Sequence, residues 1–448
     1  MPRIVLGAAS SDSGKTTLAL GIVAALRRRG RTVAAAKCGP DFIDSAHLAR
    51  ASGAPARNLD AYLAPEALVA RSFERGTRAR DIAIVEGVMG LFDGRHGSGA
   101  GSTAHVARIL DAPVVLVLDC AKAAATIGAI AFGLARFDPR LNVVGALLNN
   151  VASDKHAATV RDACAAAGVP VLGLIRRDER LTIASVHLGL AAPGGDAWET
   201  MLAAAADVVE RDVDLDALVA AAACAPPLRV VAPDAQSARG TSTPVRVAVA
   251  RDEAFWFYDE GSFDALRDGG AELVPYAPLR DPFPANVAAA FVGGGYPEAH
   301  APALAANGAA RAGLRAAIAA GMPAYAECGG LMYLGEALET GAATHPMVGA
   351  IPAISTMSPK RSALRYVEAR ALAEGPFFAR GAVVRGHEFH YSRTRYASGD
   401  AAAFAIEGES EGFARGRVHA SYVHVHLGAY QPAVDAFLDA ARAFGGPS

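Results

Sequence analysis

The stretch that most constrains this 448-residue chain is Ala8-Ala-Ser-Ser-Asp-Ser-Gly-Lys-Thr-Thr17. It follows the apolar run 4–6, which predicts a short buried strand, and precedes the apolar segment 18–26, which predicts a helix. A strand, a loop of small residues, Gly-Lys-Thr and a helix form the layout of a phosphate-binding P-loop. In such a loop, backbone N–H groups turn inward around a phosphate. We therefore expect a nucleotide site at this end of the chain.

The residues of this loop have distinct predicted roles. Lys15 would reach the outer phosphates of ATP, the hydroxyl of Thr16 would hold Mg²⁺, and the helix N-terminus adds partial positive charge. One position departs from the usual pattern, because Ala9 stands where glycine is usual. The alternative is an ordinary Ser-rich turn before a helix. The predicted ATP-binding residues are Ser13, Gly14, Lys15, Thr16 and Thr17.

Acidic residues follow two further predicted strands. Asp41 and Asp44 come just after the strand 32–36, and Glu86 ends the strand 81–86. Ligands of open α/β sheets bind at the carboxyl ends of the strands. We predict that one of the two aspartates serves Mg²⁺ (Asp41) and that both border the substrate, while Glu86 is the second metal carboxylate. The alternative for the aspartates is a helix cap with a solvated neighbour.

Two later apolar runs, 114–118 and 143–148, predict strands that flank the helical segment 121–137. This alternation indicates a mostly parallel sheet with helices on both faces. Asn150, just after the second run, is placed to read an adenine edge through its amide. A turn asparagine is an equally good interpretation of the same residue.

The composition changes near residue 219, where an Ala-rich helical pattern gives way to Pro, Ser and Gly with few apolar residues. This change predicts a linker over 219–244 between a first domain, 1–218, and a second, 245–448. The second domain opens with the apolar strand 245–250. The predicted fold class is therefore α/β, with two doubly wound domains.

The second domain contains a candidate nucleophile. Cys328 follows a predicted strand and precedes Gly-Gly and a helical pattern, which is typical of a nucleophile elbow that exposes a thiol at a helix N-terminus. The other four cysteines lack this setting. Gly294 and Gly295, after the strand 289–292, offer open N–H groups suited to an oxyanion hole or to binding glutamine.

A nucleophilic cysteine needs a base, and histidines are frequent downstream. The run 418–427 alternates like a strand, so His424 and His426 are predicted to point to the same face. We choose His424 as the base because of the family resemblance described below. The candidates are His345, His387, His390, His419, His424 and His426.

The bulk composition excludes several classes of protein. The 43 basic and 45 acidic residues give a net charge of −2, which does not indicate a nucleic-acid-binding or polybasic membrane surface. Five scattered cysteines without a CxxC pair support neither a zinc knuckle nor a disulfide framework. The longest uncharged apolar run, 123–135, is shorter than the ~20 residues needed to span a bilayer. We expect a cytoplasmic protein without a signal peptide and with no nucleic-acid or membrane partner, and leave a homodimer open.

Taken together, these motifs resemble the cobyrinate/hydrogenobyrinate a,c-diamide synthase family. Its members join a dethiobiotin-synthetase-like P-loop domain to a class I (triad-type) glutamine amidotransferase domain. The matching segments cover nearly the whole chain in the family's order and are 10–17, 37–44, 85–94, 251–255, 293–298 and 385–390.

The resemblance implies a two-site reaction. Glutamine is hydrolysed at Cys328 with His424 taking the thiol proton, and ammonia passes internally to the first domain. There MgATP phosphorylates a corrin acetate carboxylate, and ammonia displaces the phosphate to give an amide at the a and c side chains. Carried over residue by residue, Lys15 and Thr16 belong to ATP and Mg²⁺. Asp41, Asp44 and Glu86 belong to the metal and corrin site.

One departure from the wider amidotransferase pattern concerns the acid that orients the base. Many members have His-x-Glu, whereas His426 stands at the third position here. Either another acid, such as Glu298 or Glu388, orients His424, or the glutaminase works as a dyad. Alternative functions are amidation of other corrin carboxylates, as in cobyric acid synthase, and of a siroheme-derived nickel precursor. A third is a non-catalytic P-loop switch with an inert amidotransferase fold.

Overall fold

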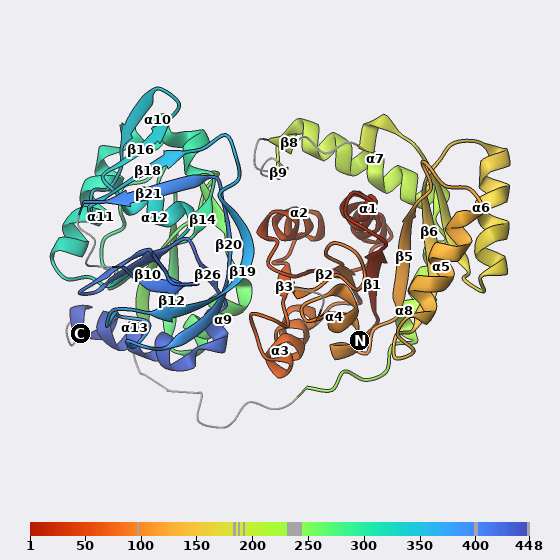
Figure 1. Cartoon of the computed structure of the whole chain (residues 1–448), viewed down its shortest axis with the longest axis horizontal. Helices are drawn as coiled ribbons and strands as arrows, with labels where there is room; N and C mark the ends of the chain where they lie inside the picture. The colour runs from red at the N-terminus through yellow and green to blue at the C-terminus, as the bar shows by residue number, and fades with distance from the viewer. Residues whose placement is uncertain are drawn as a thin grey trace. The chain divides into compact units, whose positions relative to one another are not determined.

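The computed structural model divides the chain into two compact units, Met1–Ala232 and Pro233–Ser448 (Figure 1). It describes residues 1–95, 98–181, 185–186, 189–190, 193–230, 244–397 and 402–445. Of the predicted linker 219–244, residues 231–243 lie outside the described residues. Residues 219–223 instead complete helix α8 (Leu215–Ala223), because Leu218 and Ala222 pack into the core of the N-terminal unit.

The N-terminal unit is built on a seven-stranded sheet in the order β3-β2-β4-β1-β5-β6-β7. Every pairing in this sheet is parallel, so all strands end at the same edge. The P-loop follows the central strand and therefore lies between the loops that leave β4 and β5. The strands are β1 (Arg3–Ala8), β2 (Val33–Cys38), β3 (Arg57–Leu59), β4 (Ile82–Glu86), β5 (Val114–Asp119), β6 (Val143–Val151) and β7 (Val171–Arg176).

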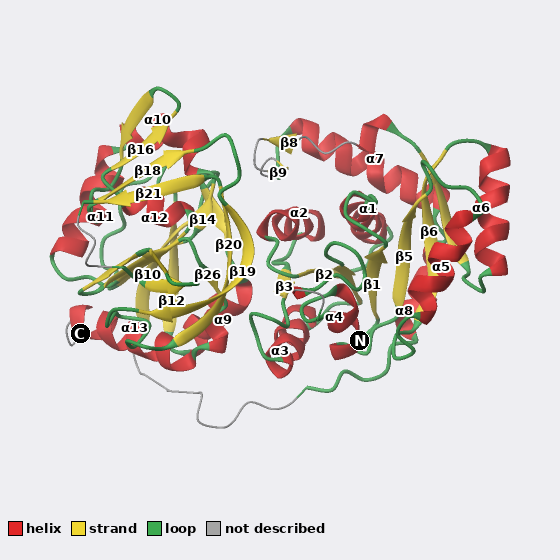
Figure 2. Ribbon diagram, in the orientation of Figure 1, coloured by secondary structure: helices red, strands yellow, loops and turns green. Residues whose placement is uncertain are grey.

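Helices cover both faces of this sheet (Figure 2). Alternate residues of β1 enter different cores: Ile4 and Leu6 pack with α1, α2, α7 and α8, whereas Val5 packs with α3 to α6. This alternation follows from the two-residue period of a strand. The helices are α1 (Lys15–Arg28), α2 (Phe42–Ser52), α3 (Glu66–Thr77), α4 (Thr103–Ile109), α5 (Thr126–Arg136), α6 (Asp154–Ala166), α7 (Asp196–Asp212) and α8.

The C-terminal unit contains a six-stranded sheet in the order β12-β10-β13-β15-β25-β24. Its strands are parallel except for β24, which pairs antiparallel with β25. Helices α9 and α13 pack on one face, and α10, α11 and α12 on the other. These elements are β10 (Val245–Ala250), β12 (Ala271–Tyr276), β13 (Ala289–Val292), β15 (Ala324–Glu327), β24 (Phe413–Arg415), β25 (Val418–Ser421), α9 (Glu260–Asp268), α10 (Ala301–Ala306), α11 (Gly308–Ala319), α12 (Gly329–Leu334) and α13 (Gln431–Gly445).

Smaller sheets of mainly antiparallel strands complete this unit, and the sequence did not predict them. One has the order β17-β16-β18-β21, another β23-β22-β19-β20-β26, and β11 pairs with β14. Their strands are β11 (Phe255–Phe257), β14 (Gly294–Gly295), β16 (Ala337–Thr340), β17 (Ala343–Pro346), β18 (Ala353–Met357), β19 (Ala363–Ala371), β20 (Val383–His390), β21 (Ser392–Tyr396), β22 (Phe404–Ile406), β23 (Glu409–Glu411) and β26 (His424–Val425).

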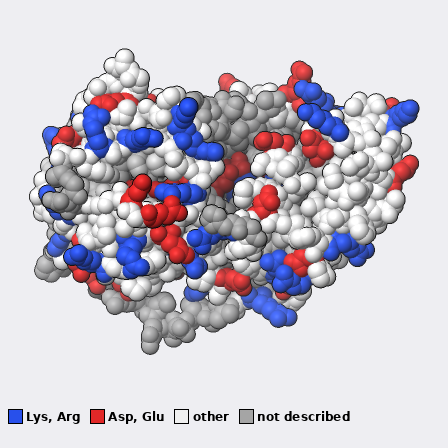
Figure 3. Space-filling model, viewed as in Figure 1, with Lys and Arg blue, Asp and Glu red and all other residues white. Residues whose placement is uncertain are grey.

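The predicted fold class is confirmed, since each unit has a largely parallel sheet with helices on both faces. None of the helices formed by the described residues combines the length and apolar character that crossing a bilayer requires. Basic and acidic side chains are both spread over the face that Figure 3 shows.

Candidate active sites

The P-loop of the N-terminal unit connects β1 to α1. Gly14 caps the helix with φ of +88°, a left-handed conformation that glycine adopts without strain. The Ser13 hydroxyl donates to the carbonyl oxygen of Ser10 (2.9 Å). Lys15 Nζ donates to the carbonyl oxygens of Ser10 (2.9 Å) and Met89 (2.8 Å). The loop thus curls around the lysine and directs it toward the segment after β4.

A buried ion cluster lies beside this loop. Lys37, on β2, donates from Nζ to Asp44 Oδ2 (2.5 Å), Glu86 Oε1 (2.7 Å) and the Gly87 carbonyl oxygen (3.2 Å). The Thr16 hydroxyl donates to Glu86 Oε1 (2.6 Å) and lies 3.3 Å from Asp44 Oδ2. Lys37 therefore brings Asp44 and Glu86 together, and the sequence analysis gave this lysine no role.

The pKa values in this cluster follow from burial and from one cation facing several acids. Burial alone would lower the pKa of Lys37, but Glu86 and Asp44 outweigh it and raise that pKa. Burial raises the pKa of Glu86 to about 7, although Lys37 opposes the shift. Burial also opposes ionisation of Asp44, yet Lys37 holds its pKa below the ordinary value. Burial, together with the charge of Lys37, lowers the pKa of Lys15.

Asp41 serves as the N-cap of α2, where its Oδ1 accepts a hydrogen bond from the Asp44 backbone N–H (2.9 Å). The alternative interpretation was a helix-capping aspartate with a solvated neighbour. It was correct for Asp41, which caps α2, and wrong for Asp44, which is buried against Lys37. Burial, and next the charge of Asp44, raises the pKa of Asp41 to about 6.

The donor set of this cluster fits Mg²⁺. Glu86 Oε2 is buried and has no hydrogen-bond partner, while the Thr16 hydroxyl lies against the other oxygen of the same carboxylate. Protein sites for Mg²⁺ usually supply one or two carboxylates and leave the remaining positions to phosphate oxygens and water. Among the described residues, no group of three or more His, Cys, Asp or Glu side chains could hold a metal ion.

These residues border a cavity of about 510 Å³. Its lining includes Lys37 and most of the predicted ATP, metal and substrate residues, which are Gly14, Lys15, Thr16, Thr17, Asp41, Asp44 and Glu86. Residues from the P-loop, β2, α2 and β4 are therefore brought to one place, as expected where parallel strands end at one edge.

The predicted adenine reader, Asn150, has φ of +58° and donates from Nδ2 to Asp119 Oδ1 (2.9 Å) in a solvent-exposed hydrogen bond. Its neighbour Asn149 contacts the P-loop instead, donating from Nδ2 to the Ser13 carbonyl oxygen (3.1 Å). A Cβ at Gly14 would lie 2.2 Å from this amide nitrogen. With Asn149 in this place, position 14 has room only for glycine.

In the C-terminal unit, Cys328 occupies a sharp turn between β15 and α12. Its φ of +49° is rare for a residue with a side chain, and its N–H donates to the Ser421 carbonyl oxygen (2.7 Å). A Cβ at Gly330 would lie 2.0 Å from the Val292 carbonyl oxygen, so the turn requires glycine there. Cys328 Sγ lies 3.7 Å from the Phe389 carbonyl oxygen. These contacts form the geometry of a nucleophile elbow.

His424 is the histidine paired with this thiol. Its Nδ1 lies 3.3 Å from Glu327 Oε2. Burial alone would lower the pKa of His424, but hydrogen bonds to Cys328 and Glu327 outweigh it and raise the pKa to about 10. Cys328 and His424 are thus an acid–base pair in contact.

His424 and His426 have different polar partners. Strand β26 ends at Val425, and His426 follows it in an extended conformation. The Nε2 of His426 lies 3.4 Å from Asp259 Oδ1 at the start of α9, away from the Cys328 pair.

The glycine loop after β13 lies against both catalytic candidates. A Cβ at Gly294 would be 2.7 Å from His424 Cε1. A Cβ at Gly329, the residue after Cys328, would be 3.1 Å from the Gly295 backbone nitrogen. Gly294 therefore lies beside His424, and Gly295 lies beside Gly329, the residue after the nucleophile.

Two family models match the chain. The CobQ/CobB/MinD/ParA nucleotide binding domain matches residues 4–188, and the CobB/CobQ-like glutamine amidotransferase domain matches residues 246–432. The cobyrinate a,c-diamide synthase of Syntrophotalea carbinolica is 43% identical over 455 residues, covering 98% of this chain and 99% of the relative. The chain belongs to the cobyrinate/hydrogenobyrinate a,c-diamide synthase family.

Other relatives in this synthase family span the chain to a similar extent. The cobyrinate a,c-diamide synthase of Dehalococcoides mccartyi strain CBDB1 is 41% identical and covers 95% of both chains. The hydrogenobyrinate a,c-diamide synthase of Streptomyces coelicolor is 40% identical over 99% of this chain and 98% of the relative. The resemblance drawn from the motifs is therefore confirmed.

Three residues at the two sites had no role in the sequence analysis: Lys37, Asn149 and Glu327. Lys37 had a usable signal, because a lysine that interrupts an apolar strand is seldom buried without a partner. Glu327 had a weaker signal, as an acid directly before the nucleophile. Glu388, one of the proposed orienting acids, instead binds Arg365 Nε (2.8 Å). For the other, Glu298, burial raises the pKa to about 7.

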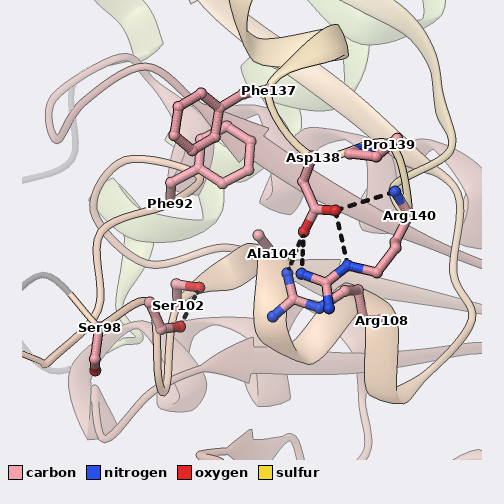
Figure 4. Close-up of a pocket in the computed structure, with 10 residues that line it drawn as sticks. Phe92, Ser98, Ser102, Ala104, Arg108, Phe137, Asp138, Pro139 and Arg140 are labelled. Atoms are coloured by element: carbon pink, nitrogen blue, oxygen red, sulfur yellow. Dashed lines mark hydrogen bonds and ion pairs between the residues drawn. The ribbon is translucent and has the colours of Figure 1, made fainter.

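The synthase fold has a second hollow in its N-terminal unit, of about 420 Å³ (Figure 4). Arg108 and Arg140 both point toward Asp138, with N···Oδ2 distances of 2.7 and 2.8 Å. Hydrogen bonds from Arg140 lower the pKa of Asp138 to about 2. At this hollow the two arginines therefore share one carboxylate.

Proposed function

We propose that this chain catalyses ATP- and glutamine-dependent amidation of the a and c acetate carboxylates of cobyrinic or hydrogenobyrinic acid in cobalamin biosynthesis. The observation that carries the proposal is the joint match of both domain models and of synthases named for this reaction over 98% of the chain. The contact between Cys328 and His424 supports an active glutaminase rather than an inert amidotransferase fold.

In the glutaminase half, the Cys328 thiolate attacks the side-chain carbonyl carbon of glutamine, and His424 receives the thiol proton. The Gly294 and Gly295 segment supplies N–H groups near the developing oxyanion, which is where preorganised donors stabilise an acyl-transfer transition state. His424 returns its proton to the leaving nitrogen, which departs as ammonia. Water then releases glutamate from the thioester, with His424 acting as the base.

In the synthetase half, the P-loop backbone at Ser13, Gly14 and Thr17 encloses the ATP phosphates, and Lys15 neutralises their charge. Thr16, Asp41 and Glu86 hold Mg²⁺, while Asp41 and Asp44 border the corrin carboxylate. Asn150 reads the adenine edge. Bound MgATP supplies the phosphoryl group that converts a carboxylate to an acyl phosphate. Ammonia displaces this phosphate to give the amide and inorganic phosphate.

The remaining parts of the proposal concern organisation. The N-terminal unit, up to the end of helix α8, is the amide-ligase domain, and residues 245–448 form the amidotransferase domain. The protein works in the cytoplasm, where ATP and glutamine are supplied. A homodimer is also part of the proposal. Light scattering at micromolar concentration tests this last part.

The decisive experiment incubates the full chain with MgATP, glutamine and either hydrogenobyrinic or cobyrinic acid, and counts added amides by mass spectrometry. We expect two amides on at least one corrin. Cys328→Ala should abolish amidation with glutamine and retain it with ammonium. Failure with both corrins would exclude the a,c-diamide assignment and direct the assay to Ni-sirohydrochlorin. Addition of four amides would indicate a cobyric acid synthase, and absence of any ligase or glutaminase turnover a P-loop switch.

A further inference from the structure

We propose that Glu327, the residue directly before the nucleophile, is the positioning residue that orients His424. This inference rests on the proposed glutaminase function of Cys328 and His424. In the His-x-Glu pattern, the orienting acid stands two residues after the catalytic histidine. In this chain that position is His426, which contacts Asp259, so the orienting acid must come from another part of the sequence.

The Glu327 carboxylate is fixed on both of its oxygens. Oε2 lies 3.3 Å from His424 Nδ1. Oε1 accepts hydrogen bonds from the Tyr325 hydroxyl (2.8 Å) and from the Val425 backbone N–H (3.1 Å). The carboxylate therefore binds both the imidazole of His424 and the backbone of the next residue, so it sets the orientation of the ring and the position of its strand together.

Strand geometry explains why an acid can serve from this position. Tyr325 and Glu327 lie two residues apart on β15 and so point to the same face. Glu327 pairs in register with Ser421 on the neighbouring strand β25. His424 follows Ser421 by three residues, and its side chain contacts Glu327. Cys328, in contrast, follows the strand, and its positive φ turns the backbone at the nucleophile.

The chemical consequence concerns the two ring nitrogens. With Nδ1–H donated to Glu327, Nε2 is left to exchange the proton with Cys328. The carboxylate also stabilises the imidazolium that forms when the thiol ionises, as an acid does in a catalytic triad. The titratable groups near His424 are Glu327, Cys328, His387 and His390. Burial lowers the pKa of His387 to about 3 and that of His390 to about 4, so both are neutral near pH 7.

Other acids of this unit have partners of their own. Glu388 binds Arg365, and Glu411 accepts hydrogen bonds from the Ser421 hydroxyl (2.5 Å) and the Tyr422 N–H (2.7 Å). Glu388 is nevertheless buried on β20, which pairs with the strand that carries His424. It is therefore a matched control: a buried glutamate in the same sheet, without a role in the proposed network.

The test compares Glu327→Gln, Glu327→Asp and Glu388→Gln in the full chain. For Glu327→Gln we expect the glutaminase kcat to fall at least about 100-fold with a much smaller change in the KM for glutamine, since a triad acid acts on the base rather than on substrate binding. Glu327→Asp should restore part of the loss. Glu388→Gln should stay within about threefold of the wild type, and all three should keep ammonium-dependent amidation.

A second readout follows the thiol itself. The rate of Cys328 alkylation by iodoacetamide is measured against pH in each protein. Glu327→Gln should move the inflection to higher pH, because the imidazolium that favours the thiolate is no longer stabilised. An unchanged profile together with a kcat within about threefold of the wild type would overturn the proposal and establish a Cys–His dyad.

If the Glu327 variants fail to fold, the wild-type protein still decides the question. With ¹⁵N-labelled histidine, the resonances of His424, assigned by comparison with His424→Gln, report which ring nitrogen carries the proton. We expect a proton on Nδ1 in a strong hydrogen bond. A neutral ring protonated on Nε2 alone would overturn the assignment.

Discussion

The two active sites hold their charges in different ways. Around the P-loop, Lys37 binds two carboxylates that come from α2 and β4, so residues far apart in the sequence depend on one buried cation. Around the elbow, Glu327 and Cys328 are adjacent in the sequence, and a single imidazole joins them. The first site is an ion cluster and the second is a short chain of proton donors and acceptors.

This difference matches the proposed chemistry of each half. The synthetase half stabilises the charge of phosphates and a metal ion, for which several fixed charges in one cavity are suited. The glutaminase half moves one proton between a thiol, an imidazole and a leaving nitrogen, for which orientation matters more than total charge. If the comparison holds, loss of a charged side chain at the first site should mainly lower the free energy of unfolding. A small displacement of a side chain at the second site should mainly lower the glutaminase kcat.

The largest expected effect comes from Lys37→Met. Its removal leaves Asp44 and Glu86 buried without their cation, and breaking a buried ion pair typically costs about 3–5 kcal/mol. We expect a loss of this size in the free energy of unfolding of the N-terminal unit at pH 8, measured by urea denaturation. The loss should be smaller at pH 5, because Glu86 then binds a proton.

The double variant Lys37→Met/Glu86→Gln is the control for this effect. It removes one of the two uncompensated acids and should recover part of the lost stability. A Lys37→Met protein that loses less than about 1 kcal/mol would mean that the cluster is not held by its central cation, and the contrast between the two sites would lose its basis.

The next largest effect is a pH dependence of stability that comes from Glu411. The groups that donate hydrogen bonds to its carboxylate, the Ser421 hydroxyl and the Tyr422 N–H, are neutral. Burial raises its pKa to about 7 from an ordinary 4.5. The folded state therefore binds this proton more tightly than the unfolded state. Its contribution to stability is fully present below pH 4.5 and is lost as the pH rises to 7, by about 3 kcal/mol in total.

Glu411→Gln should remove this dependence. Between pH 5 and pH 8, the wild type should lose about 2–3 kcal/mol of unfolding free energy relative to the variant, measured by urea denaturation at both pH values. Glu409→Gln, at an exposed position on the same strand, is the control and should run parallel to the wild type. A Glu411 variant that also runs parallel would show that this carboxyl is ionised in the folded protein without cost.

A displacement at the second site is tested by Gly294→Ala. The new Cβ would lie 2.7 Å from His424 Cε1, so the ring must move. Misplacing a catalytic group by about 1 Å can cost 10²-fold, and we expect a 10–100-fold loss of glutaminase kcat with ammonium-dependent amidation unchanged. Gly308→Ala is the control, because no atom lies within 4 Å of its added Cβ. Equal activities of the two variants would contradict the tight placement of His424.

The sequence predicted the parts of each site that are contiguous. Local patterns of strand, glycine and helix predicted the P-loop, the elbow around Cys328 and the acids at strand ends. The same patterns predicted the α/β fold of both units. The links between segments were not predictable, because they depend on register and side-chain direction. Lys37 meets Glu86 through the pairing of β2 with β4. Glu327 meets His424 after a separation of 97 residues.

The same limit explains the errors. The antiparallel sheets formed by β16 to β23 were missed, and apart from β19 and β20 their strands have only three to five residues, which gives weak periodicity. The linker prediction began too early because helix α8 continues to Ala223, and Ala222 packs into the core.

The smallest expected effect lies at Asn149, which joins β6 to the P-loop through its hydrogen bond to Ser13. Loss of one such bond typically costs about 1 kcal/mol, so Asn149→Ala should raise the KM for MgATP about fivefold with either nitrogen source. Glutaminase kcat should not change. Asn150→Ala is the companion variant, because its amide binds Asp119 rather than the loop. A larger KM effect from Asn150 than from Asn149 would favour adenine reading at Asn150. A larger KM effect from Asn149 would mean that β6 affects nucleotide binding by fixing the P-loop through Asn149. In the same way, Lys37 fixes the positions of Asp44 and Glu86.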